Sequence, residues 1–235
     1  QMKAAPLRRP VRAPIPASFL AGLLALPMSA DAGAGSGVTT FTVLADLARN
    51  VAGDGYPPTP QEIVGAVDAD FVLWTGLGLE RWFEQFLTNL GEVPSATLTD
   101  GIQPISIAVD HDGKPDPHAR MPIPNALIHV DNIATALSAA DPANAATCAA
   151  NAIVSKPQLT AALDPLKARI AALPEDSRWL ATCEGAFGTL TRDLAPDLCL
   201  SKLYLWPINA DQQVSHRKVR AVIDGVRAHR VPAVF

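Results

Sequence analysis

The sequence predicts an α/β protein in which parallel sheets are flanked by helices. From Val38 onward, short apolar runs alternate with amphipathic segments, which is the pattern of repeated βα units. Residues 71–74 form a continuous apolar run, typical of a strand that is buried on both faces. With 235 residues, the chain is long enough to bury a substantial core in one large unit or two small ones.

Composition excludes some classes of function. The formal net charge is −4 and the charges are spread out with no basic block, so we expect no nucleic-acid partner. The three cysteines, Cys148, Cys183 and Cys199, are too few and too far apart for a disulfide framework or a zinc knuckle. We expect three unpaired thiols, with a Cys183–Cys199 bridge as the alternative in an oxidising compartment.

Residues 1–37 are predicted to be a signal peptide followed by a flexible N-terminus. Three arginines between Arg8 and Arg12 precede an apolar run at 17–26, and small residues follow around Ala30-Asp31-Ala32. The apolar run is too short to span a bilayer as a helix. No cysteine follows this run, so we expect a soluble periplasmic protein without a lipid anchor.

In the first half of the chain, we expect a strand at 39–44 and then a short helix that Asp46 caps and that ends near Gly53. The strand at 71–74 leads into the clearest helix of the sequence, whose apolar residues recur every three or four positions. That helix spans 79–90, further extended segments are predicted at 96–98 and 102–108, and another helix is predicted at 125–140.

The second half opens with a long helical stretch at 143–173. Pro157 should kink or break this stretch, because proline lacks the backbone donor and clashes with the preceding helical turn. Strands and helices then alternate again, which implies a second parallel sheet covered on both faces. The predicted strands are 179–182, 203–206 and 231–235, and the predicted helices are 186–194 and 217–229.

Two short motifs carry the candidate chemistry. Asp116-Pro117-His118-Ala119 and Thr182-Cys183-Glu184-Gly185-Ala186-Phe187 each place one metal-binding donor where a strand is expected to meet a helix. Each has a plainer interpretation. A histidine after Asp-Pro is commonly a loop or helix-cap residue, and a carboxylate such as Glu184 is stabilised by the dipole of a following helix.

With the segments around them, these motifs resemble the metal-binding receptors of bacterial ABC importers, the manganese, iron and zinc solute-binding family, and within it the enterobacterial-type manganese/iron receptors. The resemblance implies two α/β lobes at 38–140 and 176–235, joined by one long backbone helix within 141–175. It also implies that the C-terminal lobe is truncated and that metal is held in the cleft between the lobes. The other matching segments are 43–54, 76–80, 125–127, 179–187 and 203–213.

The resemblance assigns the metal ligands one at a time. His118 matches the second ligand of the family, and Glu184 matches the third. A carboxylate in the third position is typical of manganese and iron members, whereas zinc members commonly have a histidine there. The chemistry agrees, because oxygen donors suit the harder Mn²⁺ and an all-imidazole set favours tetrahedral Zn²⁺. The expected cargo is therefore manganese or iron, with zinc as the alternative.

Two of the four family ligands have no match. The first, a histidine in a loop before a Gly-Tyr-x-Pro-Thr-Pro stretch, is replaced by Asp54, which directly follows the first predicted helix. The fourth, an aspartate, lies in the family beyond the final predicted strand, and the sequence stops at Phe235 before that position. Arg120-Met121-Pro122 also departs from the family, which usually has a tryptophan there.

The predicted function is that of a periplasmic solute-binding protein that delivers a divalent metal to the membrane permease of an ABC importer, as a monomer and not as an enzyme. The alternatives are a degenerate or fragmentary relative that keeps the scaffold without tight metal binding, and a metal-assisted hydrolase. No serine elbow, phosphate loop or His-Glu-x-x-His motif supports catalysis. The remaining histidines are expected on solvated surface; they are His111, His129, His216 and His229.

Overall fold

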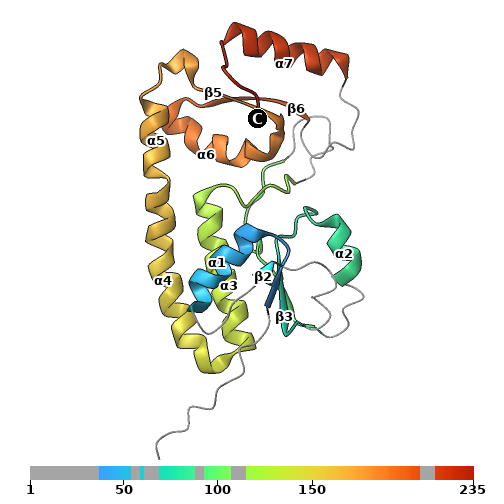
Figure 1. Cartoon of the computed structure of the whole chain (residues 1–235), viewed down its shortest axis with the longest axis vertical. Coiled ribbons are helices and arrows are strands. Elements are labelled where there is room, and N and C mark those ends of the chain that lie inside the picture. The colour runs from blue at the N-terminus through green and yellow to red at the C-terminus, as the bar shows by residue number, and fades with distance from the viewer. Residues whose placement is uncertain (1–36, 54–58, 61–68, 88–92, 107–114, 207–214) are drawn as a thin grey trace, which may run out of the picture. The chain divides into compact units, whose positions relative to one another are not determined.

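The computed structural model confirms the predicted fold class of parallel sheets flanked by helices (Figure 1). The part of the chain from Ala34 to Phe235 forms one compact unit. None of the helices in the described part of the chain combines the length and apolar character needed to cross a membrane. The structure describes residues 37–53, 59–60, 69–87, 93–106, 115–206 and 215–235.

The first sheet has four parallel strands in the order β2-β1-β3-β4. Its register places Val38 of β1 opposite Val72 of β3, and Leu73 of β3 opposite Ala96 of β4. Parallel neighbours need a crossover between them, and the helices α1 and α2 lie on those connections. The bounds are β1 (Gly37–Thr39), α1 (Thr42–Ala52), β2 (Thr59–Pro60), β3 (Phe71–Trp74), α2 (Arg81–Leu87) and β4 (Ser95–Thr97).

Strand β3 is buried on both faces, as its continuous apolar run predicts. Phe71 and Leu73 point into a core with α1, α3 (Ile123–Ala140) and α4 (Ala145–Ala162), whereas Val72 packs on the opposite face against Phe83 of α2. The period of two along a strand sends neighbouring side chains to opposite faces, so both layers of helices are anchored on the same strand.

The predicted strand at 39–44 is wrong beyond Thr39. Strand β1 ends there, and α1 begins at Thr42, so Asp46 lies inside α1 and does not cap it. The reason is the spacing of the apolar residues after residue 42, which is helical and buries one face of α1. Gly53 does end the helix as predicted, with φ at +66°. The buried residues of α1 are Leu44, Ala45, Leu47, Ala48, Val51 and Ala52.

Two other predictions for the first half are confirmed only in part. The helix predicted at 79–90 is present as α2, which ends at Leu87, and residues 88–90 lie outside the described residues. The segment predicted at 102–108 forms no strand within its described part; Ser106 makes one isolated antiparallel bridge with Pro115, and residues 107–108 are outside the described residues. The helix predicted at 125–140 is α3.

The long helical stretch is interrupted at a different residue from the one predicted. Pro157 lies inside α4, and the interruption falls at Leu163, before α5 (Asp164–Ala171). Pro157 removes a donor to the carbonyl of Ile153, but Ile153 is 73% exposed, so water can satisfy that carbonyl. Pro165 stands in the first turn of α5, where proline is favoured. Helices α1 and α3 both pack on α4 (Figure 1).

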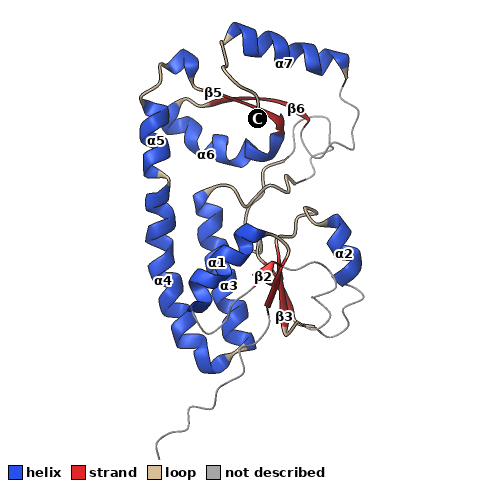
Figure 2. Cartoon of the chain, viewed as in Figure 1, coloured by secondary structure: helices blue, strands red, loops and turns tan. Residues whose placement is uncertain are grey.

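The second sheet pairs β5 (Trp179–Glu184) with β6 (Ser201–Trp206) in parallel. Helices α6 (Gly188–Leu198) and α7 (His216–Ala228) contact β6 and lie on opposite sides of the two strands (Figure 2). The predicted strand at 231–235 is reduced to one pairing. The Phe235 N–H donates to Ala181 O at 3.0 Å and the Cys183 N–H donates to Phe235 O at 2.6 Å, which is a parallel-strand pattern.

The prediction that the remaining histidines are solvated is wrong for His129. This side chain is 0% exposed, and neither ring nitrogen has a hydrogen-bond partner among the described residues. His229 is half-buried and stacks on Trp179 with ring centroids 3.7 Å apart. His216 is exposed, and His111 lies outside the described residues. Burial at 129 follows from its place on the inner face of α3, beside Val130 and Ile133 of the core.

Burial, together with the nearby charge of Arg120, lowers the pKa of His129 from 6.5 to about 4. The unfolded chain therefore takes up a proton at His129 before the folded protein does. This lowers the free energy of unfolding as the pH falls from about 6.5 to about 4, with no further loss below that. The shift corresponds to roughly 3 kcal/mol.

We expect His129→Phe to remove this component of acid sensitivity while keeping an aromatic ring in the core. Urea unfolding between pH 7 and pH 4 should show that the variant loses roughly 3 kcal/mol less stability than the parent protein. His216→Gln, at an exposed position, should behave like the parent. If the free energy of unfolding fell equally with pH in the His129 variant and in the parent protein, the buried imidazole would not be the cause of the acid sensitivity.

Candidate metal centre

Both predicted ligands lie next to ends of regular elements. Glu184 is the last residue of β5, and a 3-10 turn at Gly185–Phe187 leads from it into α6. His118 lies a few residues before α3. The carboxyl ends of parallel strands are the common place for ligand sites in α/β folds, because side chains from several strands and loops converge there.

Asp116 fixes the orientation of the His118 ring. Its Oδ1 accepts the His118 backbone N–H at 2.9 Å and also contacts Nδ1 of the same residue at 2.9 Å. Asp116 and His118 are both buried, at 6% and 3% exposure. An ionised carboxylate only accepts hydrogen bonds, so this contact favours the tautomer with the proton on Nδ1 and the lone pair on Nε2. This is the carboxylate–histidine arrangement that positions metal-binding imidazoles.

That Nε2 atom faces Glu184. The distance from His118 Nε2 to Glu184 Oε1 is 3.4 Å. Thr189 of α6 donates its hydroxyl to His118 O at 3.1 Å, which ties α6 to the histidine's backbone. The Glu184 side chain is 30% exposed while that of His118 is 4% exposed, so solvent reaches the pair from the Glu184 side. The structure therefore brings the two sequence-predicted residues together.

Gly188 leaves room for the Lys202 ammonium group beside Oδ2 of Asp116. A methyl group on Gly188 would lie 3.0 Å from Lys202 Nζ and 3.3 Å from Asp116 Oδ2, both tighter than ordinary contacts. The bare backbone at the start of α6 therefore lets the Lys202 ammonium and the Asp116 carboxylate approach the same point. Partial burial lowers the pKa of Lys202, while the charge of Asp116 raises it.

Glu80 and Arg120 add further charge near the pair. Glu80 is fully buried, and its carboxylate accepts from Thr40 Oγ1 at 2.7 Å and from two backbone N–H groups, those of Thr75 at 2.7 Å and Gly76 at 3.0 Å. It thus joins the ends of β1 and β3. Burial lowers the pKa of Arg120, and the charges of three carboxylates raise it, those of Glu80, Glu184 and Asp116. The Arg120 Cζ atom lies 5.2 Å from the centroid of the Phe41 ring.

The family model described as "Zinc-uptake complex component A periplasmic" (ZnuA) matches residues 38–235. The chain belongs to this family. Among curated relatives, the iron-binding protein YfeA of Yersinia pestis is 43% identical over 214 residues, which are 84% of this chain and 68% of YfeA. The manganese ABC transporter substrate-binding lipoprotein PsaA of Streptococcus pneumoniae is 26% identical over 221 residues, covering 84% of this chain and 70% of PsaA.

Solved structures agree with the ZnuA-family assignment. A Mn-bound periplasmic metal-binding protein from Candidatus Liberibacter asiaticus superposes with a TM-score of 0.72 at 31% identity, over 86% of this chain and 79% of its own. The periplasmic zinc-binding protein TroA of Treponema pallidum gives a TM-score of 0.74 at 20% identity, over 86% of this chain and 78% of its own, and supports the fold alone. The family consists of solute-binding transport proteins, which confirms that the chain is not an enzyme.

Within the described residues, no group of three or more histidine, cysteine or acidic side chains is arranged to hold a metal. Asp54, the sequence-predicted stand-in for the first ZnuA-family ligand, lies outside those residues. From the sequence, Asp116 was recognised only as part of the Asp-Pro-His-Ala motif. Its carboxylate, two residues before His118, could have indicated a residue that orients the histidine ring. Glu80 and Lys202 gave no such signal, because their roles depend on contacts between segments far apart in the chain.

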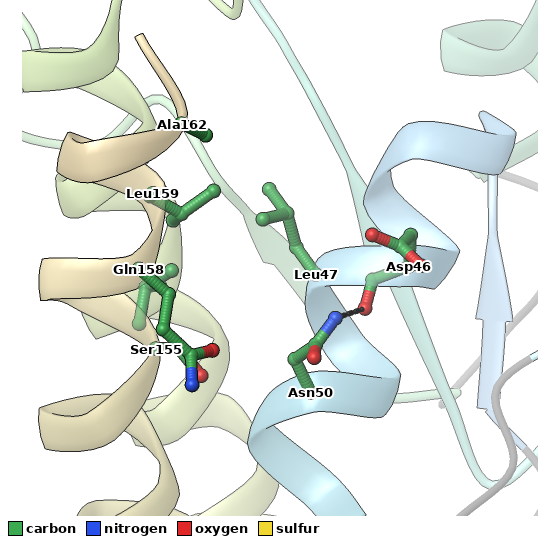
Figure 3. A pocket seen from close by; sticks show the side chains of 8 residues that line it. Asp46, Leu47, Asn50, Ser155, Gln158, Leu159 and Ala162 are labelled. Atoms are coloured by element: carbon green, nitrogen blue, oxygen red, sulfur yellow. Dashed lines mark hydrogen bonds between the residues drawn. The ribbon is translucent and has the colours of Figure 1, made fainter. Parts of the chain in front are cut away.

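A separate hollow of about 170 Å³ lies between α1, α3 and α4 (Figure 3). Two of its polar side chains are occupied within their own helices: Asn50 donates to Asp46 O at 2.8 Å, and Ser155 donates to Asn151 O at 2.8 Å. Leu47, Leu159 and other apolar side chains complete the lining, so we interpret the hollow as a gap in helix packing.

We expect ¹⁵N NMR of the metal-free protein at about pH 8 to show His118 with its proton on Nδ1 and none on Nε2. Asp116→Ala should abolish this preference, because the acceptor for the Nδ1 proton is removed. The exposed His216 provides an internal reference in both spectra. A proton on Nε2 of His118 in the parent protein would contradict the proposed orientation of the ring.

Proposed function

We propose that the chain is a periplasmic solute-binding protein that delivers a divalent transition metal, Mn²⁺, Fe²⁺ or Zn²⁺, to the membrane permease of an ABC importer. The observation that carries this proposal is the His118–Glu184 pair, with Nε2 and Oε1 3.4 Å apart and Nδ1 held by Asp116. YfeA is named for iron and PsaA for manganese, so the relatives support a transition-metal cargo.

The separation of the two donors suits one shared ion. With metal–ligand bonds of about 2.1 Å, two atoms 3.4 Å apart subtend an angle of about 110° at the metal. A mixed imidazole and carboxylate pair is compatible with Mn²⁺, Fe²⁺ and Zn²⁺. The 30% exposure of the Glu184 side chain gives the ion a route to the pair.

Two donors alone leave a first-row divalent ion coordinated mainly by water, which limits both affinity and selectivity. We therefore propose weak binding by these two residues, with Zn²⁺ preferred over Mn²⁺ in keeping with the general order of affinities. The described residues hold no third donor beside this pair. That observation favours the second candidate function, a relative that keeps the scaffold without tight metal binding. Tight stoichiometric Mn²⁺ binding would require further ligands, with Asp54 as the first candidate.

We propose that the protein acts as a monomer, that the signal peptide lies within residues 1–37, of which Gly37 already belongs to β1, and that the lobes are 38–140 and 176–235 with 141–175 between them. The two sheets, separated in sequence by α3, α4 and α5, support that division.

The direct test is isothermal titration of metal-stripped protein with Zn²⁺ and Mn²⁺. We expect His118→Ala and Glu184→Ala each to weaken Zn²⁺ binding by about tenfold or more, because each removes one of two donors. His216→Ala and Glu175→Ala, at exposed positions, are the matched controls and should bind like the parent protein. Equal Zn²⁺ affinity in all five proteins would exclude His118 and Glu184 as the metal site.

A further inference from the structure

We propose that Thr189 is a positioning residue for the metal site, because its hydroxyl holds the backbone of His118 at the distance from Glu184 at which both side chains reach one ion. This inference rests on the proposed function of His118 and Glu184. Thr189 acts through His118, since its hydroxyl donates to the backbone carbonyl of that residue at 3.1 Å.

A short and regular connection joins Thr189 to Glu184. Glu184 ends β5, a 3-10 turn at Gly185–Phe187 follows it, and Thr189 is the second residue of α6. The backbone N–H of Gly188 donates to Gly185 O, so the turn leads directly into the helix. Strand, turn and helix each fix their backbone dihedrals, and a bond that holds Thr189 therefore also restricts the position of Glu184.

The acceptor of this hydrogen bond belongs to a segment that is itself anchored. Asp116 Oδ1 accepts the backbone N–H of His118 at 2.9 Å, and the Asn125 side chain of α3 donates to Ala119 O at 2.6 Å. The Thr189 hydroxyl thus ties the first turn of α6 to a segment that α3 already holds. It connects the two motifs that carry the proposed metal ligands, although the bonded residues are 71 positions apart.

Burial makes the hydrogen bond between Thr189 and His118 costly to lose. Thr189 is 1% exposed and His118 is 3% exposed. A buried carbonyl that loses its donor finds no water in its place, so the backbone has to move before the carbonyl regains a partner. Gly188, the residue before Thr189, also lies close to this segment, since a methyl group on it would be 3.3 Å from Asp116 Oδ2.

The consequence for metal binding follows from the placement of the two donors. His118 Nε2 and Glu184 Oε1 are 3.4 Å apart, which suits one shared ion. Without the Thr189 hydroxyl, part of the metal-free population would hold the donors farther apart. The apparent affinity falls in proportion to the fraction of molecules that remain competent to bind. The net contribution of one such hydrogen bond corresponds to a change of about fivefold.

The experiment compares Thr189→Val, which removes the hydroxyl at nearly constant shape, with Thr189→Ser, which keeps it. Isothermal titration of metal-stripped protein with Zn²⁺ should show about fivefold weaker binding by Thr189→Val and an affinity within about twofold of the parent for Thr189→Ser. Thr191→Val is the matched control and should bind like the parent. Thr191 is also buried in α6, but its hydroxyl donates within its own turn, to Phe187 O and Gly188 O at 3.0 Å each.

Urea unfolding of the metal-free variants separates positioning from general destabilisation. Both valine variants lose a buried hydroxyl, so both should be less stable than the parent, and only Thr189→Val should also bind Zn²⁺ more weakly. If Thr189→Val does not fold, Thr189→Ala takes its place with the same expectation, because it lacks the hydroxyl and sets no methyl group against His118 O.

Each outcome decides one proposal. Zn²⁺ binding that depends on His118 but is unchanged in Thr189→Val overturns the role of Thr189 and leaves the proposed function intact. Equal weakening in Thr189→Val and Thr191→Val also overturns it, because loosened packing of α6 would then be responsible. Unfolding of both Thr189→Val and Thr189→Ala overturns it as well, since the bond would then serve folding. Zn²⁺ binding that is absent from the parent, or independent of His118, overturns the proposed function and this inference with it.

Discussion

The hydrogen bonds that Asp116 makes to His118 are the constraint on which the candidate site depends. One carboxylate oxygen accepts from the backbone and faces the ring nitrogen Nδ1 of the same histidine, each at 2.9 Å, so both the position and the orientation of the imidazole are fixed. The other oxygen points toward the start of α6, where Gly188 leaves room for it and for Lys202. This carboxylate therefore helps to hold the ring in the orientation in which Nε2 faces Glu184.

The two sheets contribute to the site in different ways. In the first sheet, buried Glu80 joins the ends of β1 and β3 through Thr40, Thr75 and Gly76, and so fixes the end of that sheet. In the second, β5 ends at Glu184, and α6 begins soon afterwards and bonds the backbone of His118 through Thr189. The donors are therefore positioned by short polar contacts between segments that lie far apart in sequence, and the two apolar cores support the first sheet.

The sequence was informative where local pattern decides structure. The continuous run 71–74 predicted β3, and the two metal-donor motifs predicted residues that the fold places 3.4 Å apart. The sequence was misleading where the outcome depends on whether a residue faces solvent or the core. Pro157 is tolerated because Ile153 faces solvent, and His129 is buried because α3 turns that face inward.

The central claim is that His118 and Glu184 bind the same metal ion. Anomalous diffraction at the zinc edge, from crystals of the protein grown with Zn²⁺, tests it most directly. One peak is predicted within about 2.2 Å of both His118 Nε2 and Glu184 Oε1, with Asp116 still bonded to Nδ1. A zinc peak elsewhere, with His118 Nε2 outside its coordination sphere, would contradict the claim.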